Sequence, residues 1–240
     1  MAEQNDNIQQ QPAICKTRDE MLAKFLTDDS LNDIILKGTD SVEVPANRFL
    51  LSARSEVFKG MLLGKFQEAS LPVVELSFTG SVLQAVVEFV LTDDAQILNS
   101  KKRKTTDGEE EEEHVSIQQI ESLVSLAEAA SYFNIAGLGE LVMDYCTTVR
   151  KKWPCLSFAF LQVCRTAGNS VPDVVLDKAK KWVRKTPAKS VSTNHVGFLS
   201  KTVMEEILMD SEMEMSECDL FIILSLWVEA DPSQRKDSGV

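Results

Sequence analysis

Strand-like sequence is confined to the first third of this 240-residue chain, and this limits the fold more than any other feature. Apolar runs bounded by turn residues predict strands at Ile34–Leu36, Ser41–Val44 and Val73–Leu76, with the first two joined as a hairpin. Every later apolar pattern repeats with a helical period. The sequence therefore predicts an α/β (α+β) domain, with a short sheet surrounded by helices, followed by an all-α region.

Several predicted helices begin at capping residues. Ser55 precedes a helix through Leu62, and Ser116-Ile-Gln-Gln119 has capping-box spacing before a helix that carries Ile120 and Leu123. Ser81 has the same spacing before a helix through Val90, and Pro45 is expected to end the second strand, with helical pattern from Ala46. Further helices are predicted at Ile135–Val149, Leu156–Ala167, Val171–Val183, Leu199–Met209 and Cys218–Val228. In the last of them, Leu220, Leu224 and Trp227 mark the buried face.

Changes in composition divide the chain into regions. Residues 1–16 are rich in Gln, Asn and Asp and predict a flexible tail. An α/β domain at 17–148 would then carry a charged, exposed insertion at about 93–115, which contains Lys101-Lys-Arg-Lys104 and five glutamates from Glu109 to Glu113. A helical domain at 149–230 and a polar tail at 231–240 complete the predicted organisation.

Charge and hydropathy exclude some classes of partner. The formal net charge of -12 disfavours direct nucleic-acid binding, which draws on clustered Lys and Arg. No apolar run approaches the ~18 residues of a membrane span, and the N-terminus lacks a secretory signal, so no membrane partner is expected. Five cysteines without a CxxC pair indicate reduced, inert thiols, and the predicted location is cytoplasmic and/or nuclear.

The sequence offers few groups for catalysis. Its two histidines are His114, beside the acidic run, and His195, in a Ser/Thr/Asn-rich stretch, and neither setting indicates a nucleophilic triad. Phosphate-binding and nucleophile-elbow motifs are missing, and the cysteine spacing does not fit a metal site. We therefore predict a protein that is not an enzyme and that carries no cofactor or metal.

The order of elements and three stretches of sequence resemble a BTB (POZ) domain. These stretches are LNDIILKGTDSVEVPANRFLLSARSEVFKGML, FQEASLPVVEL and LQAVVEFVLTDD, and the likeness covers about residues 18–148. Residues 149–230 are similar to a BACK-type helical domain through their helix count and the final SECDLFIILSLWVEAD. The resemblance implies a homodimeric protein–protein interaction module.

Four residues at helical spacing predict the apolar face of a short helix near the N-terminus: Met21, Leu22, Phe25 and Leu26. The resemblance implies that this is the N-terminal helix that BTB domains exchange across a two-fold homodimer. The alternative is that this helix packs on its own chain. Asp33 and Arg48 match two positions of a charged pocket near the family's dimer interface, and the alternative is that both are solvated at element ends.

Phe66-Gln67-Glu68 matches the apolar-x-Glu element by which many BTB adaptors contact the cullin-3 scaffold. The resemblance thus implies a substrate adaptor of a cullin-3 RING ubiquitin ligase, with an unknown protein substrate. In the other interpretation Phe66 packs beneath its loop and Glu68 faces solvent. The competing function is a BTB scaffold or transcriptional regulator that gathers partner proteins.

The basic run Lys101, Lys102, Arg103 and Lys104 fits a nuclear-import signal or, equally, a solvated charge cluster.

Overall fold

The computed structural model describes residues 24, 28–98 and 115–235. Its strands are β1 (Ile34–Lys37), β2 (Glu43–Ala46) and β3 (Val73–Glu75). In chain order, its helices begin with α2 (Arg48–Arg54), α3 (Glu56–Leu63), α4 (Gly80–Thr92), α5 (Ile117–Tyr132) and α6 (Leu138–Lys152). They are followed by α7 (Ser157–Ala167), α8 (Asp173–Arg184), α9 (Thr193–Val196), α10 (Lys201–Leu208), α11 (Glu217–Ala230) and α12 (Pro232–Arg235).

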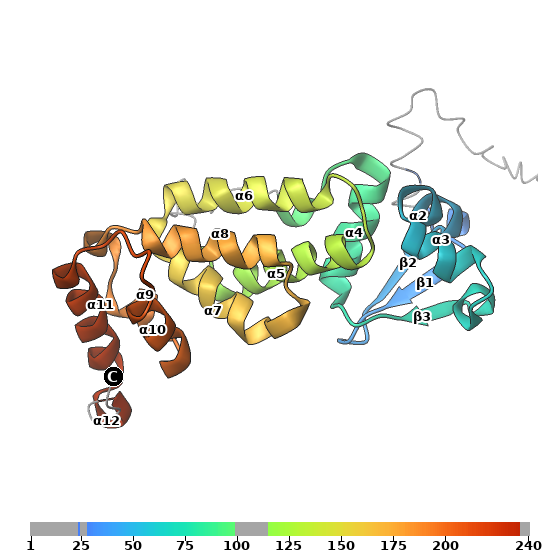
Figure 1. Ribbon diagram of the computed structural model, residues 1–240. Coiled ribbons are helices and arrows are strands. Elements are labelled where there is room, and N and C mark those ends of the chain that lie inside the picture. Colours follow the sequence, from blue (N-terminus) through green and yellow to red (C-terminus); the bar gives the residue numbers. More distant parts are fainter. Residues whose placement is uncertain (1–23, 25–27, 99–114, 236–240) are drawn as a thin grey trace, which may run out of the picture.

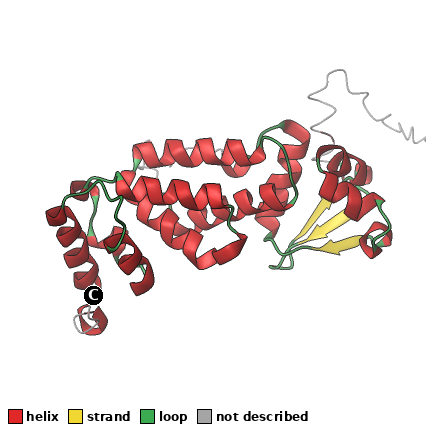
Figure 2. Cartoon of the chain, viewed as in Figure 1, coloured by secondary structure: helices red, strands yellow, loops and turns green. Residues whose placement is uncertain are grey.

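The molecule is elongated and has three parts in a row (Figure 1). The sheet lies at one end with α2 and α3, the helices α5–α8 form the middle, and α9–α12 form the far end. Among the residues that the structure describes, the strands all lie in the first part, and the other two parts are built of helices and loops (Figure 2). The predicted fold class, a short sheet surrounded by helices and followed by helices, is confirmed.

The sheet has the order β2-β1-β3, with β1 antiparallel to β2 and parallel to β3. Leu36 at its centre lies opposite both Val44 and Val74, and all three side chains are buried. Pro45 was expected to end the second strand, but it lies inside β2. An edge strand accepts proline because one side of its backbone has no ladder partner. Ala46 consequently belongs to β2 as well and does not begin a helix.

The start of α4 also differs from the prediction at Ser81. The helix begins one residue earlier, at Gly80, whose N–H lies 3.0 Å from the Asp40 carboxylate oxygen Oδ1. A Cβ at Gly80 would lie 2.4 Å from the side chain of Val42, so glycine is needed for this close approach. A carboxylate from the hairpin turn therefore supplies the helix-end contact that sequence spacing assigned to a serine.

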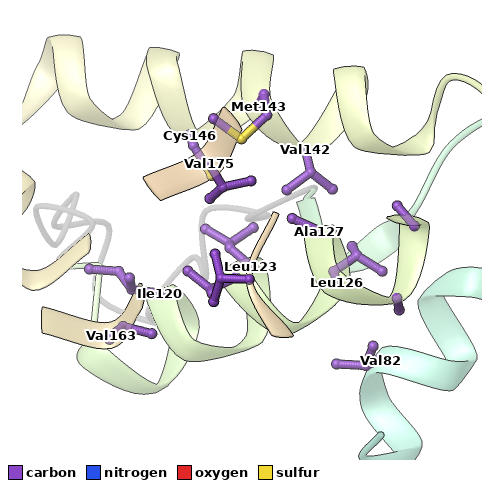
Figure 3. Packing of buried hydrophobic residues seen from close by; sticks show 14 of the residues in the cluster. Val82, Ile120, Leu123, Leu126, Ala127, Val142, Met143, Cys146, Val163 and Val175 are labelled. Atoms are coloured by element: carbon purple, nitrogen blue, oxygen red, sulfur yellow. The ribbon is translucent and has the colours of Figure 1, made fainter. Parts of the chain in front are cut away.

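Helices α5–α8 pack around a common apolar core (Figure 3). Leu123 of α5 and Met143 of α6 line this core together with Phe160 of α7 and Val175 of α8. The predicted capping box at Ser116 is confirmed at the start of α5. Helix α5 packs on α4, α6 and α7, and one buried cluster extends from Leu36 of the sheet through the α5–α8 helices to Trp227 of α11.

At the far end, Trp227 of α11 is almost fully buried, and its indole N–H donates to the Leu199 carbonyl at 2.8 Å. The predicted face is only partly correct, because Ile223 is fully buried beside Trp227 while Leu220 and Leu224 are half-buried. Arg235 of α12 lies over the Trp227 ring, 4.5 Å from its centroid. The first residues of the predicted polar tail therefore pack on the fold.

The first residues of the predicted insertion at about 93–115 pack on the fold. Ala95 and Leu98 are buried, and the 3₁₀ turn Gln96–Leu98 is held by a hydrogen bond from the Gln96 N–H to the Glu88 carboxylate at 2.9 Å. Residues 93–98 thus belong to the fold. The predicted tail at 1–16 and both charge blocks of the insertion lie outside the described residues.

Candidate protein-docking site

The candidate site is the docking loop, which we define as Gly64–Pro72 between α3 and β3. Gly64 ends α3 at a point where a Cβ would lie 2.1 Å from the Gly60 carbonyl oxygen, so a larger residue would have to displace the backbone. The loop then forms a single 3₁₀ turn, Gln67–Ser70. The Leu71 N–H donates to the Glu68 carbonyl at 3.2 Å and closes this turn before β3.

Phe66 points out of the loop, with 66% of its surface exposed. It does not pack beneath the loop, which was the alternative interpretation of this residue. Glu68, two positions later, is half-buried in the 3₁₀ turn. The docking loop therefore presents an aromatic ring next to a carboxylate.

Two leucines at the ends of the docking loop are also exposed. Leu63, at the end of α3, is 56% exposed, and Leu71, at the end of the loop, is 45% exposed. Apolar side chains that stay in contact with water favour association with a partner surface that covers them. Leu63, Phe66 and Leu71 thus provide a candidate interface in one short segment.

In the predicted charged pocket, the Asp33 carboxylate and the Arg48 guanidinium bind backbone groups and not each other. Asp33 is exposed, and its carboxylate accepts a hydrogen bond at 2.8 Å from the backbone N–H of Arg48. The Arg48 guanidinium is half-buried and donates to backbone carbonyls around the docking loop, those of Ala69 and Leu71 among them. The two residues are adjacent, but their side chains serve separate partners. A role at a dimer interface stays a prediction.

Other predicted site residues fall outside the described part of the chain. They are the dimer-helix residues Met21, Leu22, Phe25 and Leu26 and the basic run Lys101, Lys102, Arg103 and Lys104. Among the described residues, Phe49 on α2 is an apolar side chain that is 71% exposed.

Polar and nucleophilic side chains also lie outside the docking loop. An open depression of about 490 Å³ beside β1 and β2 is lined by Asp33 and Glu43 together with apolar and amide side chains, which do not form a nucleophile–base pair. Burial raises the pKa of the Cys146 and Cys164 thiols to about 12, so both are protonated at neutral pH. Cys218 is exposed. Residues 28–98 and 115–235 hold no group of three or more His, Cys, Asp and Glu placed to bind a metal ion.

None of the helices in the described ranges combines the length and the apolar composition needed to cross a bilayer.

The family model of the BTB/POZ domain matches residues 22–149, more than half of the chain. The chain belongs to the BTB/POZ family. BTB domains mediate self-association and protein partnering, so this part of the chain is a protein–protein interaction module. No curated protein matches the chain.

The BTB match ends inside α6, which runs from Leu138 to Lys152. The helices that follow are consistent with the predicted C-terminal helical domain, whose likeness to BACK stays a prediction. The contact between Arg48 and the docking loop was missed by sequence reasoning. Its acceptors are backbone carbonyls, which leave no trace in residue identity.

Proposed function

We propose that the protein is a homodimeric substrate adaptor of a cullin-3 RING ubiquitin ligase, with the docking loop as the cullin contact. The observation that carries this proposal is the exposure of Phe66 at the position that matches the apolar-x-Glu element. Membership of the BTB/POZ family supports an interaction function of this kind.

The chemistry of the loop suits a small hot spot. Burying apolar surface contributes roughly 25 cal/mol per Å², and aromatic anchors in partner pockets dominate many interfaces. Phe66 would supply this burial, with Leu63 and Leu71 excluding water around it. The Glu68 carboxylate would favour one orientation of the partner, since charged groups near an interface select register and partner more than they add affinity.

Dimerisation is proposed from the family resemblance and is supported by exposed apolar surface on α2. Phe49 on α2 is 71% exposed, and Leu31, in the turn before β1, is 36% exposed. The Leu31 carbonyl accepts a hydrogen bond from the side-chain amide of Asn47 at 2.9 Å. The chain leads into this turn directly from the predicted dimer helix at residues 21–26. A second copy of the chain would cover both side chains.

In this mechanism the protein makes and breaks no bond. It raises the concentration of a protein substrate near the ligase, and a dimer makes the assembly bivalent. The helical part after α6 is the proposed substrate-reading region, and the cytoplasm, the nucleus or both are the proposed locations.

The test is cullin-3 binding by the intact chain and by the double variant Phe66→Ala/Glu68→Ala, measured by calorimetry with purified cullin-3. Loss of a hot spot worth about 2 kcal/mol weakens binding roughly 30-fold. Phe221→Ala is the matched control, because Phe221 on α11 is 70% exposed but lies in the far part of the molecule. Wild-type protein that does not bind, or a double variant that binds as tightly, would reject the adaptor function.

Sedimentation of the same samples tests the dimer. We expect a dimeric mass at micromolar concentration for wild type and for both variants. A monomer would sink the dimer proposal without affecting the docking loop.

A further inference from the structure

The docking loop has little apolar packing to hold it in place. From Leu63 to Pro72 every residue is exposed or half-buried, and Phe66 and Leu71 face away from the core. Segments with few buried apolar contacts open at low free-energy cost. The position of Phe66 relative to the rest of the domain therefore depends on hydrogen bonds.

Arg48 supplies such bonds from the first turn of α2. Its Nη1 donates to the carbonyl oxygen of Leu62 at 3.3 Å and to that of Ala69 at 3.1 Å. A longer contact of 3.5 Å joins Nη1 to the Glu68 carbonyl, and Nη2 donates to the Leu71 carbonyl. One guanidinium thus reaches the last turn of α3, the 3₁₀ turn and the residue that precedes Pro72.

These acceptors are groups that need donors. Carbonyls in the last turn of a helix have no partner within that helix, and Leu62 belongs to this turn of α3. A hydrogen bond from an ionised donor is roughly twice as strong as a neutral one. Arginine also presents its donors in a rigid planar fork, whereas lysine offers one compact ammonium that cannot span both ends of the loop.

The base of the arginine is itself fixed. Its backbone N–H is bound by the Asp33 carboxylate at 2.8 Å, and the neighbouring Asn47 side chain caps α2 by accepting from the Leu50 N–H at 3.1 Å. The first turn of α2 is therefore held independently of the docking loop, and the guanidinium extends from a rigid support.

We propose that Arg48 is the positioning residue of the docking loop: by tying the end of α3 and the 3₁₀ turn to α2, it holds Phe66 and Glu68 in the orientation that a partner binds. The identity of that partner rests on the proposed function, whereas the contact between Arg48 and the loop does not. This role differs from that of a charged-pocket residue, because the acceptors are carbonyls of the loop and not the Asp33 carboxylate.

The test compares Arg48→Lys with Arg54→Lys by amide hydrogen exchange of residues 62–72. Both arginines lie on α2, but Arg54 pairs with Asp93 and lies over the Phe89 ring, away from the loop. Losing one or more charge-assisted hydrogen bonds should speed exchange in the loop about tenfold to a hundredfold in Arg48→Lys. Arg54→Lys should leave exchange there unchanged. Equal exchange in Arg48→Lys and wild type would overturn the inference.

Cleavage at Lys65 by a lysine-specific protease is a second measure of how readily the docking loop opens, because Lys65 is exposed within the loop. We expect faster cleavage there in Arg48→Lys than in Arg54→Lys. If Arg48→Lys does not fold, NMR of the arginine side chains in the wild-type protein decides instead. A freely rotating Arg48 guanidinium would overturn the inference, and a hindered one would support it.

Cullin-3 affinity separates this inference from the proposed function. If wild type binds, Arg48→Lys should bind about tenfold more weakly, as expected from the loss of roughly 1.4 kcal/mol. Faster loop exchange with unchanged affinity would overturn the positioning role. If wild type does not bind, the adaptor function fails, and hydrogen exchange alone decides whether Arg48 holds the loop.

Discussion

The docking loop and the α5–α8 bundle are stabilised in opposite ways. In the bundle, side chains such as Leu123 and Val142 are buried in a common core, and the backbone bonds lie within helices. In the loop no side chain is buried, and an arginine from another helix binds the backbone carbonyls. Apolar packing is strong but non-directional, whereas hydrogen bonds fix direction at a modest net gain. Stability and the proposed recognition are therefore assigned to separate groups in this molecule.

The largest expected effect on stability comes from truncating a buried phenylalanine, in comparison with truncating an exposed one. Phe133 is fully buried and stacks on Phe58 with ring centroids 4.2 Å apart. Phe133→Ala should lower the free energy of unfolding by about 3–5 kcal/mol, measured by urea denaturation, because it leaves a cavity at the junction of α3 and α5. Phe66→Ala should change it by less than about 0.5 kcal/mol, since exposed side chains contribute little to stability. A large loss of stability in Phe66→Ala would remove the contrast between core and loop.

An intermediate effect is expected at Ser55. This buried residue caps α3 by accepting from the Phe58 N–H at 3.0 Å, and its hydroxyl donates to the Phe133 carbonyl. Ser55→Ala should cost about 1–2 kcal/mol, because it removes a helix cap and leaves a buried carbonyl without its donor. Thermal unfolding measures this, with Ser70→Ala in the exposed 3₁₀ turn as the control. Equal melting temperatures for the two variants would contradict the expectation.

The smallest effect concerns a surface ion-pair network between α7, α8 and α10. A hydrogen bond from Arg165 lowers the pKa of the Glu206 carboxyl below its ordinary value of 4.5, and Lys180 lies 3.2 Å away. Because the folded pKa is lower than the unfolded one, the network stabilises the protein above about pH 4.5 and loses this effect as the pH falls through the folded pKa.

Glu206→Gln should therefore reduce the free energy of unfolding by at most about 1 kcal/mol at pH 7, the upper range for exposed pairs. The difference from wild type should shrink as the pH is lowered below 4.5, the ordinary pKa of this carboxyl. Urea denaturation at several pH values and low salt measures it. A difference in unfolding free energy that grows towards acid pH would contradict the expected direction of the pH dependence.

Sequence reasoning succeeded where the contacts that define a helix or strand lie within that element. Ser55 and the capping box at Ser116 mark helix starts through contacts within a few residues, and Leu36 lies in an apolar run of strand type. It failed where the deciding contact came from elsewhere. The start of α4 depends on Asp40, a residue of the distant hairpin turn.

The candidate site was predictable in part. Phe66 and Glu68 were found because the family resemblance places an apolar-x-Glu element there, and their position in a loop follows from the turn residues around them. Arg48 was expected to take part in a charged pocket, because the family resemblance places it and Asp33 at two positions of such a pocket. Its carbonyl acceptors lie 14 to 23 positions along the chain and depend only on the path of the backbone.

Helix α6 has a consequence for how far apart two bound proteins would lie. Its 15 residues rise about 1.5 Å each and so span roughly 22 Å, and the end of the BTB match lies inside this unbroken helix. A flexible linker of that length would allow a broad distribution of end-to-end distances. A continuous helix packed against α5 sets one direction, so in the proposed adaptor a substrate held by the helices after α6 would lie in one geometry relative to Phe66.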